Sequence, residues 1–183
     1  MKKLLAPVTV SILVGLFSAC SSMDTAPVRT AGAPPLPQAS ALLAPTQGNT
    51  VQGNVIFKQE KNGSVRVIAE VSGLTPGSHG FHIHDKGDCS APDATSAGGH
   101  FNPFQTPHGK ANEGTHHAGD LPSLEANAGG NAKLNAVLNS ITLTGDHTIV
   151  GRGLIVHAAP DDYVSQPTGN AGARVACAVI QKD

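Results

Sequence analysis

The stretch SVRVIAEV, residues 64–71, alternates apolar and polar side chains along most of its length. The apolar side chains that share one side of it are Val65, Val67, Ala69 and Val71. Successive side chains of a β-strand point to opposite faces, so one face of this segment can pack in a core while the other meets solvent. The stretch therefore predicts a half-buried β-strand.

Further segments have the length and composition of short strands, and clusters of Gly, Pro and Asn separate them. They are residues 39–47, 50–59, the run around 82–84, 123–128, 132–139, 147–158 and 173–180. Gly129 and Gly130 predict a hairpin turn between two of them. Because no convincing amphipathic helix accompanies these strands, the sequence predicts an all-β sandwich or barrel of about eight strands.

The amino end has the features of an export signal. Lys2 and Lys3 precede an apolar run over residues 4–17, which is too short for a comfortable membrane span. The run closes in FSAC, residues 17–20, which resembles the lipobox of bacterial lipoproteins, although Leu or Val is usual where Phe17 stands. We expect a lipoprotein-type signal peptide over 1–19, lipidation of Cys20 and a lipid-anchored protein in the periplasm. The alternative is an ordinary cleaved signal with an incidental cysteine.

Residues 20–38 are rich in Pro, Ala and small polar side chains, which is typical of a flexible tether. A single domain is expected over residues 39–183. The formal net charge is −1, aromatic residues make up 3% of the chain, and basic runs are lacking, so a nucleic-acid partner is not expected. Once Cys20 is assigned to lipidation, Cys89 and Cys177 are left, and in an oxidising compartment they most simply form one disulfide.

Two long segments without a strand pattern, residues 85–121 and 159–172, hold most of the ligand-capable side chains. Long loops in a compact domain are usually functional. In FHIH, residues 81–84, His82 and His84 are two apart and would face one side of a strand. The other candidates are His100, His108, His116, His117, Asp120 and His157. Imidazole suits copper and zinc, and three histidines with one aspartate can form a tetrahedral zinc shell, so the set favours a metal site.

These residues stand in motifs that occur together in one family. GFHIH, GDC, GGHFNP, HAGDL, GRGLIVHA, DDY and QPTGNAGARVACAVI follow one another over residues 39–183. In this order and spacing the chain resembles the Cu,Zn superoxide dismutases, specifically the bacterial periplasmic branch. The resemblance implies an eight-stranded Greek-key barrel or sandwich, with immunoglobulin-like architecture and two long functional loops.

The resemblance also implies the ligands of one copper and one zinc ion per subunit. Copper would be bound by His82, His84, His100 and His157. Zinc would be bound by His100, His108, His117 and Asp120, so that His100 bridges the two metals. His116 is then not a ligand, and His147 is interpreted as a solvated surface residue.

The remaining family positions have supporting roles. Cys89 and Cys177 match the intrachain disulfide, and Arg174 matches the arginine that receives the anion beside copper. Asp161 matches an aspartate that links a copper ligand to a zinc ligand. Thr168 matches a threonine at the channel rim, and His79 a supporting hydrogen-bonding residue.

The implied activity is dismutation of superoxide to dioxygen and hydrogen peroxide, with His100 and Arg174 as catalytic residues and copper cycling between Cu(II) and Cu(I). The enzyme would protect the cell envelope from exogenous superoxide. Lys86 and Lys110 are weak candidates for longer-range steering of the anion. The only expected membrane contact is the lipid anchor, and the resemblance allows a homodimer as well as a monomer.

Two alternatives belong to other functional classes. A metal-buffering or copper-handling protein could use the same fold without turnover, and loss of a copper ligand or of Arg174 would favour it. A zinc hydrolase or hydratase could use three histidines and a bound water. A purified protein that is free of copper and inactive in redox reactions would favour the zinc enzyme.

Overall fold

A computed structural model describes residues 34–183, and Pro34–Asp183 forms one compact unit. The expected signal peptide, Cys20 and the tether up to residue 33 lie outside the described residues. The first strand begins at Gln38, one residue before the expected start of the domain. Within the described part, no helix has the length and apolar character needed to cross a membrane.

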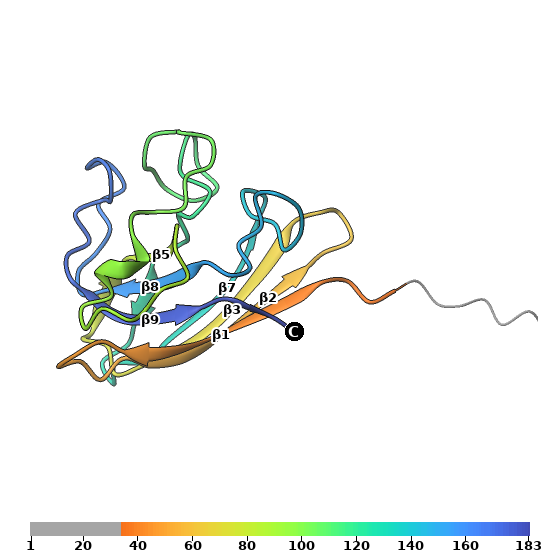
Figure 1. Cartoon of the computed structure of the whole chain (residues 1–183). Helices are drawn as coiled ribbons and strands as arrows, with labels where there is room; N and C mark the ends of the chain where they lie inside the picture. Colours follow the sequence, from red (N-terminus) through yellow and green to blue (C-terminus); the bar gives the residue numbers. More distant parts are fainter. Residues whose placement is uncertain (1–33) are drawn as a thin grey trace, which may run out of the picture. The chain divides into compact units, whose positions relative to one another are not determined.

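The described residues form ten strands and one short 3₁₀ turn (Figure 1). The elements are β1 (Gln38–Pro45), β2 (Gln52–Gln59), β3 (Val65–Ser72), β4 (Gly77–His79), β5 (Phe81–His84), η1 (Thr95–Ala97), β6 (Leu124–Ala126), β7 (Ala132–Leu138), β8 (Gly153–His157), β9 (Arg174–Val179) and β10 (Gln181–Lys182). All strand pairs are antiparallel, in the order β4-β6-β7-β3-β2-β1-β9-β8-β5. The predicted all-β barrel is confirmed, and the non-consecutive neighbours β3–β7 and β1–β9 give it crossovers of the Greek-key kind.

The strand prediction was wrong in two details. The short strands β4 and β10 were not expected, and they raise the number of strands above eight. The segment predicted as a strand over 147–158 is extended only from Gly153, because turns closed by Thr148 N to Gly145 O and Arg152 N to Ile149 O precede it. Gly145 and Gly151 both have positive φ in these turns, a conformation that glycine adopts without a steric penalty.

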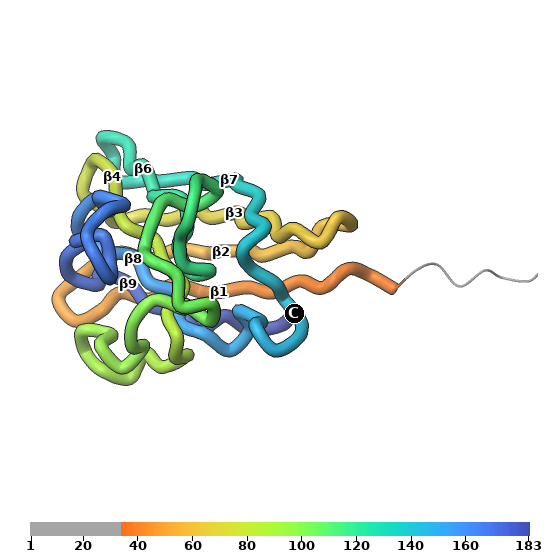
Figure 2. The backbone as a smooth tube through the Cα atoms, turned by 90° about the horizontal axis from the view of Figure 1, so that it is seen from above, coloured from red at the N-terminus to blue at the C-terminus, as the bar shows by residue number. Residues whose placement is uncertain are grey.

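Figure 2 shows β7, β3, β2 and β1 side by side in the order of the sheet. Gly80 separates β4 from β5, which stand at the two ends of the strand order. β4 pairs with β6 at one end of the strand order, and β5 pairs with β8 at the other. The Gly80 N–H donates to Ala159 O, and its carbonyl accepts from His157 N. A Cβ at Gly80 would overlap the side chain of Ala171, so glycine permits this close approach. The barrel is therefore nearly closed beside His82.

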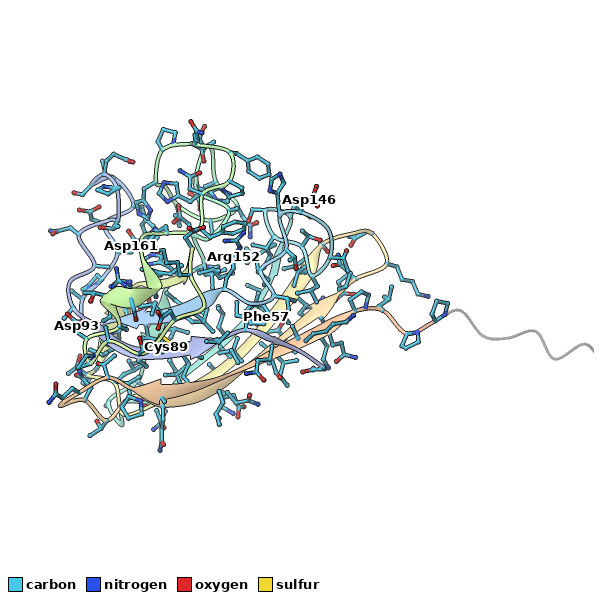
Figure 3. All side chains as sticks on the ribbon, viewed as in Figure 1. Phe57, Cys89, Asp93, Asp146, Arg152 and Asp161 are labelled. Atoms are coloured by element: carbon cyan, nitrogen blue, oxygen red, sulfur yellow. A yellow bond between two sulfur atoms is a disulfide. The ribbon has the colours of Figure 1, made fainter. Side chains whose placement is uncertain are left out.

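The alternating stretch at 64–71 forms β3 and faces the core as predicted. Its buried side chains are Val65, Val67, Ala69 and Val71, none more than 3% exposed. Phe57 of β2, opposite Val67 in the register, is fully buried in the same cluster (Figure 3). The core thus fills the barrel, and Phe101, Ala118 and Leu121 of the long loop over residues 85–121 extend it.

The predicted disulfide between Cys89 and Cys177 is confirmed. It ties the loop over residues 85–121 to β9, and its cysteines are 88 positions apart. Under this loop, Ala94 and Ala97 pack with Ile155 and Cys177 in a small apolar cluster separate from the main core. The loop is therefore held on β8 and β9 by a covalent bond and by apolar packing.

Replacing both Cys89 and Cys177 with alanine should lower the free energy of unfolding by about 2–5 kcal/mol, because the unfolded chain loses a long covalent loop. Urea denaturation monitored by circular dichroism measures this change, with Ser90→Ala as the neighbouring control. An unchanged midpoint in the double variant would show that the disulfide does not stabilise the barrel.

Candidate metal centre

β5 and β8 supply three histidines to one buried site. His82 and His84 alternate with Phe81 and Ile83 along β5, and all four side chains are buried. The apolar pair belongs to the core cluster, so the two histidines point away from it. His157 ends the neighbouring strand β8, and the pairing becomes irregular between Val156 and His157.

The loop over residues 85–121 lies along the free edge of β5 and brings further ligands to the same place. Isolated β-bridges join His84 to His100 and His82 to Asp120. Between them, Phe101 N donates to Ile83 O, and Ile83 N donates to Gly119 O, both over 2.8 Å. Backbone pairing therefore sets the positions of His100 and Asp120.

The structure brings together all seven residues predicted as ligands, in two overlapping groups. The first group is His82, His84, His100 and His157. The second group is His100, His108, His117 and Asp120. Within each group the candidate ligand atoms lie within 4.8 Å of one another, and every residue is buried. His100 belongs to both groups.

Hydrogen bonds fix the tautomers of the first group. His82 Nε2 lies 2.7 Å from Asp161 Oδ2, His84 Nδ1 lies 2.8 Å from Gly98 O, and His157 Nδ1 lies 3.1 Å from Gly172 O. These oxygens only accept hydrogen bonds, so each named nitrogen carries the proton and the other keeps a lone pair.

The nitrogens left with lone pairs are His82 Nδ1, His84 Nε2, His100 Nε2 and His157 Nε2, and they are buried without a hydrogen-bond partner among the described residues. Unpartnered buried polar atoms are costly, which favours a cation at their centre. Burial lowers the pKa of His84 to about 2, that of His157 to about 3 and that of His100 to about 4. These rings are therefore neutral at pH 7, as metal ligands must be.

The second group is built around the Asp120 carboxylate. Its Oδ1 lies 2.9, 3.1 and 3.3 Å from the Nδ1 atoms of His100, His108 and His117. Its Oδ2 accepts hydrogen bonds from the backbone N–H groups of His117 and Gly109. Three imidazole nitrogens and one carboxylate oxygen form the donor set of a tetrahedral zinc site.

The histidines and carboxylates of this group shift one another's pKa values. Burial alone would raise the pKa of Asp120, but hydrogen bonds from three histidines hold it well below its usual range. Burial likewise opposes charge on His108, yet its bonds to Asp120 and Asp161 raise its pKa to about 9. A metal ion that binds through His108 therefore displaces a proton.

Asp161, which is labelled in Figure 3, links the two groups. Its Oδ2 accepts from His82 Nε2 over 2.7 Å, and its Oδ1 accepts from His108 Nε2 over 2.9 Å. The backbone N–H of Tyr163 also donates to Oδ1 over 2.7 Å. Gly169 lies against this pair, and a Cβ there would overlap both the carboxylate and the His108 ring.

Arg174 lies beside the first group. Its guanidinium donates to Ala94 O over 2.6 Å and to Gly98 O over 2.7 Å. The same Gly98 carbonyl accepts from His84 Nδ1, so the cation is close to a member of the group. Arg174 also lines a surface hollow of about 380 Å³ with Asp93 and Thr95. A small anion can therefore meet a positive charge at this opening.

The other predicted residues lie around the centre. His79 Nδ1 lies 2.8 Å from His157 O and its Nε2 lies 2.8 Å from Thr75 O, while Thr168 is half-buried beside Gly169. His116 is outside both groups.

Two further residues named in the sequence analysis, His147 and Lys110, lie away from the two groups. His147 is exposed, although its ring centroid lies 5.1 Å from that of Phe104. Lys110 pairs with Glu113 over 2.7 Å, which weakens it as a steering charge.

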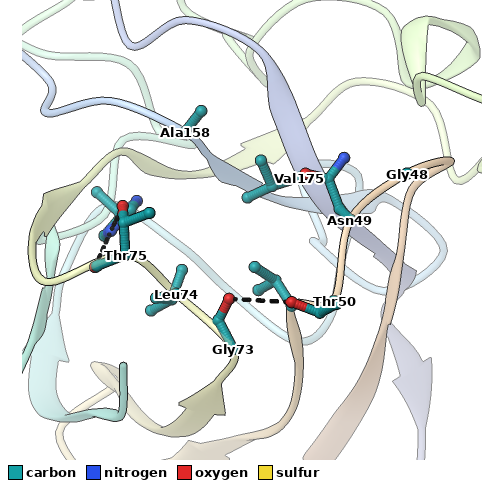
Figure 4. A pocket seen from close by; sticks show the side chains of 10 residues that line it. Gly48, Asn49, Thr50, Gly73, Leu74, Thr75, Ala158 and Val175 are labelled. Atoms are coloured by element: carbon teal, nitrogen blue, oxygen red, sulfur yellow. Dashed lines mark hydrogen bonds between the residues drawn. The ribbon is translucent and has the colours of Figure 1, made fainter. Parts of the chain in front are cut away.

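A separate cavity of about 260 Å³ lies between the ends of several strands (Figure 4). Its lining includes Thr50, Leu74, Thr75, His79 and Val175, and it contains none of the seven ligand candidates. His79 is the one titratable residue in this lining. The cavity is therefore not the metal centre.

The sequence reading missed partners that act through the backbone or through a neutral amide. The carbonyls of Gly98 and Gly172 orient His84 and His157, and the Gln166 amide contacts the backbone of His108. Every residue type has a carbonyl, so composition carries no signal for the first two. The only signal for Gln166 was its place in the second long loop.

Comparisons with known proteins agree with this centre. A protein-family model described as Copper/zinc superoxide dismutase (SODC) matches residues 51–180. The chain is also 45% identical over 148 residues to a protein named Superoxide dismutase (Cu-Zn) from Onchocerca volvulus, an alignment that covers 75% of this chain and 93% of the relative. Because the family model spans most of the barrel and both long loops, and the relative is 45% identical over 75% of this chain, the chain belongs to the copper/zinc superoxide dismutase family.

Proposed function

We propose that the first group binds copper, that the second binds zinc, and that the enzyme is of the bacterial periplasmic type. As a family member the chain is a superoxide dismutase, an oxidoreductase that uses both metals. Four buried imidazoles near Arg174 suit copper, and three imidazoles with a carboxylate suit zinc. The observation that carries the assignment is His100, whose Nδ1 faces the second group while its buried Nε2 faces the first.

When bound, copper supplies the redox step, in which one superoxide is oxidised to dioxygen and a second is reduced, with two protons, to hydrogen peroxide. Arg174 attracts the anion and orients it with two N–H groups. With its Nδ1 engaged by the second group, His100 would take up a proton at Nε2 and could deliver it to the reduced product. A complete ligand set together with Arg174 favours this activity over metal buffering or zinc hydrolysis.

The remaining residues keep the ligands in place. Asp161 and the carbonyls of Gly98 and Gly172 hold the protonated side of His82, His84 and His157, so the lone pairs stay aimed at one point. Such outer partners set the orientation and basicity of ligands in metal sites generally. The four rings therefore need little rearrangement when the metal binds.

His117→Ala should abolish tight zinc binding, because it removes one of four donors from the second group. The neighbouring His116→Ala should leave zinc content near normal, since that ring hydrogen-bonds to the backbone carbonyl of His117 and supplies no ligand atom to the group. Elemental analysis of both purified variants measures the difference. The opposite pattern would mean that the zinc ligands are assigned one residue out of register.

Arg174→Ala should retain both metals while kcat/KM falls by about 10- to 100-fold, because guanidinium attracts the anion but does not ligate metal. Arg174→Lys should recover part of the rate, since the charge survives without the two-donor geometry. Raising ionic strength should slow the wild type more than the alanine variant. Full activity of Arg174→Ala at full metal content would overturn this role.

We also propose that the enzyme is lipid-anchored through Cys20 in the periplasm and protects the cell envelope from superoxide arising outside the cell. The support is the basic and apolar leader, the FSAC sequence and the Pro- and Ala-rich segment that follows it. A homodimer stays a prediction.

Cys20→Ala should block acylation and processing, so the protein should no longer fractionate with membranes through a lipid chain. Mass spectrometry and membrane fractionation measure the two effects, with Ser21→Ala as the neighbouring control. If mass and fractionation are the same as in the wild type, Cys20 is not the anchor.

A further inference from the structure

Gln166 makes an unusual contact with the backbone of His108. Its Oε1 accepts a hydrogen bond from His108 N over 2.8 Å, and its Nε2 donates to His108 O over 3.0 Å. The two residues belong to the two long loops and are 58 positions apart in the chain. The side-chain amide therefore pairs with His108 as a neighbouring β-strand would, satisfying its donor and its acceptor together.

The turn before Gln166 prepares this contact. Asp162 Oδ1 accepts hydrogen bonds from Val164 N and Ser165 N over 2.9 and 2.7 Å, which closes the turn. Gln166 Nε2 also donates to Val164 O over 3.2 Å. The amide is thus held by its own loop before it meets His108, which reduces the conformational entropy lost in the contact.

His108 is consequently held by the second loop at both its backbone and its ring. Gln166 fixes the backbone, while Asp161 accepts a hydrogen bond from Nε2 over 2.9 Å. The remaining ring nitrogen, Nδ1, faces Asp120 in the second group. The direction in which Nδ1 points therefore depends on two residues of the loop over 159–172.

We propose that Gln166 is a positioning residue that holds His108 for zinc and couples zinc binding to the order of the loop over 159–172. The proposal rests on the assignment of zinc to the second group. Coupling between sites is reciprocal, so zinc bound through His108 also stabilises the loop. Because the loop carries Asp161 and Gly172 to His82 and His157, Gln166 connects zinc binding to the geometry around copper.

The test uses the fully metallated enzyme and three variants. Gln166→Met keeps the length of the side chain without its hydrogen bonds, and Gln166→Glu keeps only the acceptor. Gln52→Met is the control, because Gln52 is exposed on β2 and is distant in sequence from both loops. The readouts are the rate of zinc loss to a chelator, hydrogen exchange of residues 159–172, and the visible spectrum of protein with Co(II) in place of zinc.

Zinc loss should be about 10-fold faster in Gln166→Met, at the lower end of the usual effect of removing an outer partner of a metal ligand. Gln166→Glu should fall between Gln166→Met and the wild type, and Gln52→Met should equal the wild type. Hydrogen exchange over 159–172 should be fastest in Gln166→Met, intermediate in Gln166→Glu and slowest in the wild type. The Co(II) spectrum should change in Gln166→Met.

An unchanged rate of zinc loss in Gln166→Met would overturn the proposal, as would faster loss with an unchanged Co(II) spectrum and unchanged loop exchange. His108→Ala tests the assignment of the zinc ligands separately from the role of Gln166. If His108→Ala loses zinc while Gln166→Met keeps it, the zinc site stands and the role of Gln166 fails. If His108→Ala keeps zinc, the assignment of the zinc ligands fails first.

Discussion

One carboxylate, that of Asp161, holds a member of each metal group through its two oxygens. The buried anion is stabilised because His82, His108 and the Tyr163 N–H all donate to it, and these bonds keep its pKa below the usual range although burial opposes charge. The proton that His82 donates leaves its opposite ring nitrogen with a lone pair, whereas His108 must release the proton on its opposite nitrogen before it binds a metal. The two groups therefore cannot move independently, since they share Asp161 as well as His100.

The rest of the fold brings these parts to one place. The barrel closes at Gly80, where a side chain would not fit. The strand β5 follows directly and presents two histidines at this point. The disulfide between Cys89 and Cys177 holds the first long loop on β9, and Arg174 is the first residue of that strand. Its guanidinium binds the loop carbonyls at Ala94 and Gly98, so the charge that we propose receives the anion also fixes the segment before His100.

The sequence alone predicted the features that depend on side-chain pattern. The alternation at 64–71 indicated β3, and the histidine motifs named the residues that the structure brings together in two groups, because their chemistry is visible in residue type. The sequence did not predict the features that depend on backbone geometry. A turn before Gly153 makes β8 shorter than predicted, and Gly98 and Gly172 orient ligand candidates through their carbonyls. The contact between Gln166 and His108 could not be predicted either, because it joins two loops whose sequences carry no strand pattern that would pair them.

The central claim is that Asp161 orients the ligands of both metals, and Asp161→Ala tests it against its neighbour Asp162→Ala. Asp162 accepts hydrogen bonds only within its own turn among the described residues, so its removal perturbs the loop without touching a ligand. Metal content is measured by mass spectrometry after both variants are challenged with a chelator. The account predicts that Asp161→Ala loses copper and zinc, whereas Asp162→Ala, which loosens only the turn before Gln166, keeps copper and loses zinc more slowly than Asp161→Ala does. Retention of both metals by Asp161→Ala, or equal loss from the two variants, would contradict it.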